Sequence, residues 1–187
     1  MTRALVPGSI SAVARDSGRP LAMTMMDVDA VVIVDTSGSM SAHDSRGGQM
    51  RYDVACQELA TLQARMPGKL AIVSFSDIAL LCPTGEPSFL GGGTNLAGAL
   101  RYAKTFDVDG VRFIVVSDGE PDSKQDALAE AARIQGRIDT IYVGPESGAG
   151  REFLSRLARV SGGQPVAAER VLELAAAVTL LLDGRPR

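Results

Sequence analysis

Three polar residues stand at alternate positions directly after an apolar stretch of the 187-residue chain: Asp35, Ser37 and Ser39 follow DAVVIV (29–34). Two later segments add similar side chains, since GGGTNL (91–96) contains Thr94 and SDGEPD (117–122) contains Asp118. Together these residues offer two carboxylates and three hydroxyls, which is a set of oxygen ligands only. Such a set suits a hard divalent cation, Mg²⁺ in particular, rather than zinc or copper.

Each of these segments also has a purely structural interpretation. Asp, Ser, Thr and Gly turn chains and cap helices, so DTSGS (35–39) could form only a strand-to-helix turn. The same alternative holds for five later residues: Thr94 or Asn95 and Asp122 or Ser123 as helix caps, and Asp118 as the start of a turn. A cap at Thr94 would not exclude a ligand there, because the two roles are compatible.

Apolar runs of strand length alternate with stretches of helical period along the chain. Four runs are almost continuously apolar, as strands buried on both faces are: DAVVIV (29–34), KLAIVSF (69–75), VRFIVVS (111–117) and IDTIYVG (138–144). A shorter run, IALL (78–81), follows the second of them after only two residues. It is predicted to be an antiparallel hairpin partner at the edge of the sheet.

Apolar residues spaced three and four positions apart predict helices between and after these strands. They fall at 55–66, 96–103, 128–135, 153–160 and 171–181. The alternation predicts an α/β fold: a doubly wound, mostly parallel sheet with one short antiparallel edge strand and helices on both faces. Ligands of such sheets bind where loops leave the carboxyl ends of the strands, and the three polar segments fall there.

The order of these segments resembles that of von Willebrand factor type A domains. DTSGSM (35–40), Thr94 and Asp118 together are similar to the metal-ion-dependent adhesion site of that family. The resemblance runs from about residue 27 to about residue 184 and includes LSRLARVSGG (154–163), which is similar to the family's penultimate helix and its glycine-rich end. It implies the Rossmann-like fold of the family.

The resemblance also implies a role for each residue of the site. Ser37 and Ser39 would contact Mg²⁺ directly, with Mn²⁺ or Ca²⁺ as alternatives, and Thr94 would do so directly or through water. Asp35 and Asp118 would act mostly through waters and hydrogen bonds. Neutral hydroxyls leave much of the ion's charge uncompensated, so an Asp or Glu of a protein partner can complete its coordination. In relatives, entry of such a carboxylate draws the loops around Thr94 and Asp118 inward, and this movement is linked to sliding of the last helix. The alternative for this chain is a fixed core helix at 171–182.

The resemblance therefore implies a protein-binding module of the adaptor or adhesion type and not an enzyme. The rival hypothesis is a metal-dependent, phosphatase-like hydrolase with Asp35 as nucleophile. Such enzymes resemble DxDx[TV] at this point, and Ser37 stands where they need the second aspartate. A structural domain without a metal is the third alternative, and the five oxygen-bearing site residues disfavour it. The polar segment SAHDSRGGQMR (41–51) is longer than in many relatives, and His43 and Asp44 could reach the rim or simply be solvated.

Composition limits the class of partner. There are 19 Lys and Arg against 22 Asp and Glu, a net charge of −3, and the basic residues are scattered, so we expect neither nucleic acid nor a membrane as partner. Residues 1–26 are expected to form an extension of unknown role and 27–187 a single domain. Within the extension, SISAVARDSG (9–18) predicts a short helix between Ser9 and Gly18, and LAMTMM (21–26) an edge strand or a flexible lead.

Cys56 and Cys82 lack the spacing of a metal or redox motif and are predicted to be free thiols of a cytoplasmic protein. No secretory signal is predicted, because Pro7 and Gly8 interrupt the first apolar residues. Intracellular bacterial members of the family are often adaptors for larger assemblies. Richness in Ala, Gly and Arg is associated with a bacterial source, and such an adaptor role is therefore the expectation here.

Overall fold

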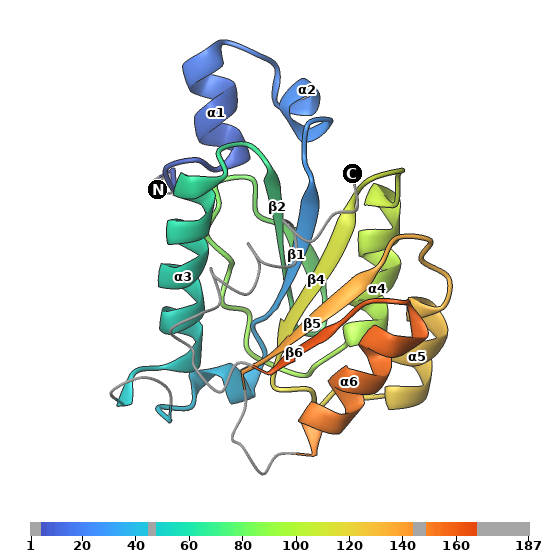
Figure 1. Cartoon of the computed structure of the whole chain (residues 1–187). Coiled ribbons are helices and arrows are strands. Elements are labelled where there is room, and N and C mark those ends of the chain that lie inside the picture. The colour runs from blue at the N-terminus through green and yellow to red at the C-terminus, as the bar shows by residue number, and fades with distance from the viewer. Residues whose placement is uncertain (1–4, 45–47, 144–148, 168–187) are drawn as a thin grey trace.

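A six-stranded sheet forms the centre of the molecule in the computed structural model, which describes residues 5–44, 48–143 and 149–167 (Figure 1). The strands lie in the order β3-β2-β1-β4-β5-β6. All neighbours are parallel except β2 and β3. Their bounds are β1 Ala30–Asp35, β2 Leu70–Phe75, β3 Ala79–Leu81, β4 Arg112–Ser117, β5 Ile138–Tyr142 and β6 Pro165–Ala167. The predicted mostly parallel sheet with one antiparallel edge strand is confirmed.

Helices cover both faces of this sheet, as predicted. The helices are α1 Ile10–Ser17, α2 Leu21–Met25, α3 Arg51–Arg65, α4 Leu96–Ala103, α5 Lys124–Ala131 and α6 Gly150–Val160. Figure 1 shows α3 on one face and α4, α5 and α6 on the other. The predicted helix at 171–181 lies outside the described residues. No helix within the described ranges is long and apolar enough to cross a membrane.

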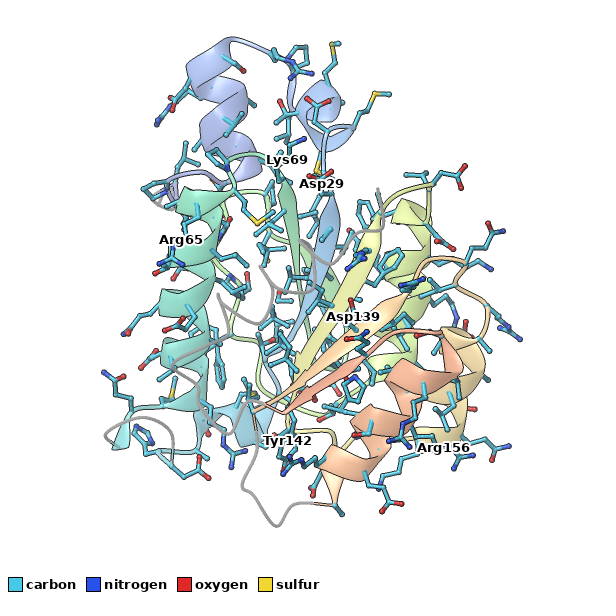
Figure 2. The ribbon with its side chains drawn as sticks, in the orientation of Figure 1. Asp29, Arg65, Lys69, Asp139, Tyr142 and Arg156 are labelled. Atoms are coloured by element: carbon cyan, nitrogen blue, oxygen red, sulfur yellow. The ribbon has the colours of Figure 1, made fainter. Side chains whose placement is uncertain are left out.

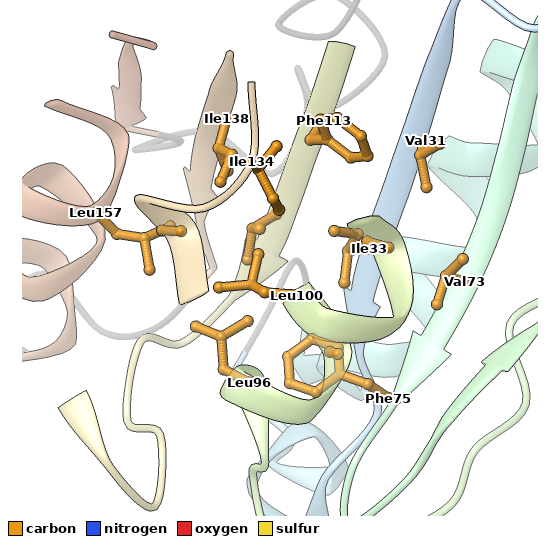
Figure 3. Packing of buried hydrophobic residues seen from close by; sticks show 14 of the residues in the cluster. Val31, Ile33, Val73, Phe75, Leu96, Leu100, Phe113, Ile134, Ile138 and Leu157 are labelled. Atoms are coloured by element: carbon orange, nitrogen blue, oxygen red, sulfur yellow. The ribbon is translucent and has the colours of Figure 1, made fainter. Parts of the chain in front are cut away.

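Successive residues of the central strands supply two separate cores, because side chains of a strand alternate between the faces of a sheet. Val31 and Ile33 pack with Leu96, Leu100 and other residues beneath α4, α5 and α6 (Figure 3). Val32 and Val34 pack in the opposite direction, in the cluster that includes Leu59 and Leu62 of α3. Each central strand is therefore buried on both sides, which explains why its sequence is almost continuously apolar.

Two short elements differ from the sequence prediction. Residues 21–25 form helix α2 and neither a strand nor a flexible lead, because Pro20 precedes good helix formers and its carbonyl accepts the N–H groups of Met23 and Thr24. Strand β6, at Pro165–Ala167, was not predicted from the sequence. It has only three residues and begins with proline, which an edge strand tolerates, so its pairing with β5 defines it rather than its composition.

The segment before the first strand packs against the rest of the chain. The Ser9 hydroxyl accepts the Ala12 N–H and Gly18, at φ 66°, ends α1, so the predicted caps of this helix are confirmed. Val6 donates its N–H to the carbonyl of Thr84, and Ile10 is buried in the larger core. The domain boundary near residue 27 and the role of the extension stay predictions.

Both cysteines are free thiols, as predicted. Cys56 is half-buried in α3, and burial is the main cause that raises the pKa of its thiol to about 11. Cys82 is fully buried beyond β3, where its sulfur lies 3.3 Å from the Ser74 hydroxyl. Both thus serve as small side chains of the interior.

Asp139 is a buried carboxylate near the start of β5, away from the loops at the carboxyl ends of the strands (Figure 2). Its Oδ1 accepts the Gln164 N–H at 2.8 Å, whereas Oδ2 is buried without a hydrogen-bond partner among the described residues. Burial raises the pKa of Asp139 above its ordinary 3.8, against the opposing effects of that hydrogen bond and of Arg112 and Arg137. The folded state therefore holds this proton more tightly than the unfolded chain does.

We predict that Asp139→Asn is more stable than the wild type at neutral pH. A raised folded-state pKa contributes stability that is complete below the unfolded pKa and is lost as the pH rises through the folded pKa. The amide keeps an acceptor for Gln164 and never ionises, so the stability difference should shrink as the pH falls toward about 4. Urea unfolding of both proteins at neutral and acidic pH measures it. A difference independent of pH would show that burial of the charge is not the cause.

Candidate metal centre

Four of the five predicted site residues come from the carboxyl ends of the adjacent strands β1 and β4, at the lower edge of the sheet in Figure 1. Val34 pairs with Val116, so Asp35 at the end of β1 and Asp118 just beyond β4 emerge side by side. Ser37 and Ser39 continue from β1. Thr94 stands two residues before α4 and reaches this edge through its own loop.

Asp35 is completely buried and holds the first loop in shape. Its Oδ1 accepts the N–H of Ser37 at 2.9 Å, and its Oδ2 accepts the hydroxyl of Ser117 at 2.6 Å. Burial raises the pKa of Asp35 above 3.8, although the hydrogen bonds from Ser117 and Ser37 oppose the shift. Ser117 was missed as a site residue. The signal that could have found it is its place directly after the apolar run Phe113 to Val116 of the strand beside β1.

The hydroxyls of Ser37 and Ser39 lie 3.2 Å apart. Ser37 is buried and Ser39 exposed, so the pair leads from the interior to the surface. A short 3-10 helix, Gly38–Ser41, forms this turn, and Met40 packs beneath it with no exposed surface. Gly38 donates its N–H to the carbonyl of Gly92 at 3.1 Å, which ties the first loop to the glycine-rich segment.

Thr94 is buried and is held by Asp122. The Asp122 carboxylate accepts the Thr94 N–H at 3.0 Å, and the Asp122 N–H is donated to the Thr94 carbonyl at 3.1 Å. Asp122 therefore joins the loop of Thr94 to the loop of Asp118 and does not cap α5, since Ser123 does so. Asn95 caps α4 by accepting the Gly98 N–H, which leaves the Thr94 side chain free of the capping role.

Asp118 is a buried carboxylate, and one of its two oxygens has a hydrogen-bond partner among the described residues. Its Oδ2 lies 3.3 Å from Nη1 of Arg51, whereas Oδ1 is buried and has no hydrogen-bond partner among the described residues. Gly119 follows with φ 76° and donates its N–H to the Ser117 hydroxyl at 2.9 Å. Asp118 also acts electrostatically on Asp35 and Tyr142, raising the pKa of both after the larger effect of burial. Tyr142 lies at the same edge, at the end of β5 (Figure 2).

Arg51, the first residue of α3, also reaches this site and was not predicted to do so. Its guanidinium forms two hydrogen bonds to the Asp44 carboxylate, one of them 2.6 Å from Nε, in addition to the contact with Asp118. A signal was available, because Arg51 stands four and eight residues before Ala55 and Leu59 and so on the buried stripe of α3. His43, the other rim candidate, is exposed, and so is Glu120.

The arrangement can hold a hard cation. No cluster of three or more His, Cys, Asp or Glu that could bind a metal occurs within the ranges the structure describes. The candidate site instead combines two carboxylates with the hydroxyls of Ser37, Ser39 and Thr94. The buried Oδ1 of Asp118 is the observation that fits a cation, because it has no donor among the residues the structure describes, and a desolvated carboxylate oxygen without a donor is costly. Small neutral and anionic oxygens are the ligands Mg²⁺ prefers.

Comparison with solved structures identifies the fold. An aerotolerance-related membrane protein from Bacteroides fragilis NCTC 9343 with multiple mutations to serines matches with TM-score 0.70 and 17% identity, over 84% of this chain and 100% of that one. The manganese-loaded TRAP protein of Plasmodium vivax matches with TM-score 0.60 and 17% identity, over 84% and 74% of the two chains. A von Willebrand factor type A protein from Catenulispora acidiphila matches with TM-score 0.62 and 16% identity, over 83% and 42%. No protein-family model and no curated protein sequence matches.

Proposed function

Because the chain has the fold of von Willebrand factor type A domains, we propose that it is a metal-dependent protein-binding module. Asp35, Ser37, Ser39, Thr94 and Asp118 hold one divalent cation, Mg²⁺ in the cell with Mn²⁺ or Ca²⁺ as substitutes. The cation binds an Asp or Glu of a protein partner. The single observation that carries the proposal is the buried Oδ1 of Asp118, which has no hydrogen-bond partner among the described residues, at the same sheet edge as the paired hydroxyls of Ser37 and Ser39.

The different roles of the site residues follow from how far each is buried. Asp35 uses both carboxylate oxygens to fix Ser37 and Ser117, so it supports the loop and contributes negative charge from behind. Ser39 is exposed and therefore offers its hydroxyl where a cation can meet an outside ligand. A cation held partly by neutral hydroxyls keeps enough charge to attract a carboxylate.

The same geometry does not favour the hydrolase hypothesis. A nucleophilic Asp35 would need an accessible oxygen, whereas its side chain is fully buried and both oxygens accept hydrogen bonds. Ser37 cannot replace the second carboxylate as a general acid. We therefore propose a binding module without catalysis. A role as adaptor for a larger assembly, in the cytoplasm, is consistent with two free thiols.

We predict that a partner captured by the immobilised protein in Mg²⁺ is released by EDTA. Ser39→Ala should abolish the capture and remain folded, because Ser39 is exposed and its hydroxyl bonds to another exchangeable hydroxyl, that of Ser37. Ser41→Ala is the matched control, since Ser41 is an exposed serine of the same turn that bonds to the Gly38 carbonyl. A pull-down from the source cell, scored in Mg²⁺ and in EDTA, tests this. Capture that survives both EDTA and Ser39→Ala would refute the metal-bridged contact.

A further inference from the structure

Arg51 places a positive charge inside the candidate metal centre. Its side chain is 8% exposed and that of Asp118 7%, so their contact is shielded from water. The arginines of two other ion pairs, Arg101–Glu130 and Arg19–Asp27, are 66% and 42% exposed. Burial of a guanidinium is costly, and a position on the buried stripe of α3 would ordinarily hold an apolar residue. Here the arginine instead meets two carboxylates.

The two oxygens of Asp118 face different surroundings. Oδ2 accepts from Nη1 of Arg51, and Oδ1 has no hydrogen-bond partner among the described residues. A cation bound at Oδ1 would share one carboxylate with a guanidinium. Two positive charges that draw on the same buried anion weaken each other's binding, and low exposure limits the screening of this effect by water.

Asp44 moderates the charge of Arg51. It accepts hydrogen bonds from Nε and Nη2, so it faces the side of the guanidinium away from Nη1. The Asp44 side chain is 49% exposed and comes from the loop before α3, whereas Asp118 is part of the site itself. Loss of Asp44 would leave the full charge of Arg51 directed at Asp118 and at any cation there.

We propose that Arg51 competes with the metal for Asp118 and thereby sets the affinity of the site, and that Asp44 limits this competition. Arg51 neutralises the charge of Asp118 when no cation is bound, so the chain folds with or without metal. When a cation binds, Arg51 lowers its affinity for the site. This inference rests on the proposed function, because it takes the cation to bind at Asp118. It adds a residue that tunes affinity without being a ligand.

Titration calorimetry with Mn²⁺ on the full chain tests this proposal, because one variant is expected to raise the affinity for Mn²⁺ and another to lower it. Arg51→Gln should bind Mn²⁺ about tenfold more tightly than the wild type, since a neighbouring unit charge shifts a carboxylate equilibrium by about a factor of ten or more. Asp44→Asn should bind several-fold more weakly. Arg51→Lys keeps the charge and should stay near the wild type, and Arg101→Gln removes an equal charge from a distant pair and should change nothing.

The possible results distinguish failure of this inference from failure of the proposed function. The inference alone would be overturned if the wild type binds Mn²⁺, Ser39→Ala does not, and folded Arg51→Gln binds Mn²⁺ no more tightly than the wild type. If Arg51→Gln does not fold, the Mn²⁺ affinity of Asp44→Asn is the deciding measurement. Binding by Asp44→Asn as tight as that of the wild type, or tighter, would overturn the inference. Tighter Mn²⁺ binding by Arg51→Gln than by the wild type, together with weaker binding by Asp44→Asn, would support it. No uptake by the wild type or by any folded variant would overturn both the inference and the proposed function.

Discussion

Asp35→Asn is expected to abolish the stabilisation of the protein by divalent metal. In the wild type, Mg²⁺ that binds only the folded state should raise Tm as its concentration passes Kd. Asparagine keeps the shape of the side chain and an acceptor for the Ser37 N–H, but it removes the buried charge behind the hydroxyls. Loss of such a supporting group weakens metal sites by about 10- to 100-fold, and loss of its charge adds to that effect. The Tm of the variant should therefore not respond to Mg²⁺.

The fold of this variant should survive without metal. Burial raises the pKa of Asp35, which means that its charge opposes folding at neutral pH, and an uncharged residue of the same shape removes that cost. Asp139→Asn is the matched control, since it makes the same change at another buried aspartate that lies far from the site. Differential scanning calorimetry with and without Mg²⁺ compares the three proteins. A metal-induced rise in Tm for Asp35→Asn equal to that of the wild type would contradict the assignment of the site.

Gly119→Ala is expected to lower the free energy of unfolding by about 3 kcal/mol or more. Gly119 has φ 76°, which costs an L-residue about 1–2 kcal/mol. A Cβ at this position would also lie 2.3 Å from the backbone oxygen of Gly150, so the loop would have to move away from the start of α6. Because Asp118 immediately precedes Gly119, the same movement should also weaken metal binding.

Gly110→Ala separates these two contributions. Gly110 has φ 87°, but a Cβ there would meet no atom within 4 Å. This control should therefore show only the backbone strain, about 1–2 kcal/mol. Urea unfolding of both variants, followed by the metal-induced shift in Tm, measures the difference. Equal losses of stability in the two proteins would show that the contact with Gly150 does not constrain the loop.

The central strands and most helices could be predicted because burial on both faces leaves a strong local pattern. Val31 to Val34 must all be apolar when alternate residues enter two cores, and no hairpin or turn produces that run. β6 and α2 could not be predicted in the same way. Three residues carry no period, and the helical form of 21–25 depends on where Pro20 stands.

The predicted site residues were found from their order along the chain, but their supporting contacts were not. Ser117 donates a hydrogen bond to Asp35, which lies 82 residues earlier in the sequence, and Asp122 accepts one from Thr94, which lies 28 residues earlier. Such pairs are set by the register of β1 against β4 and by how the loops fold, neither of which a single motif contains. Arg51 illustrates the same limit, since its position on α3 pointed inward while its partner Asp118 is fixed only by the tertiary fold.

Isothermal titration of the wild-type chain with Mg²⁺ decides whether the metal centre exists. One ion per chain should bind saturably at millimolar concentration or below, with the signal removed by EDTA and absent from Ser39→Ala. A folded wild-type protein that takes up no Mg²⁺ at millimolar concentration, and no Mn²⁺ in its place, would contradict the proposed metal centre.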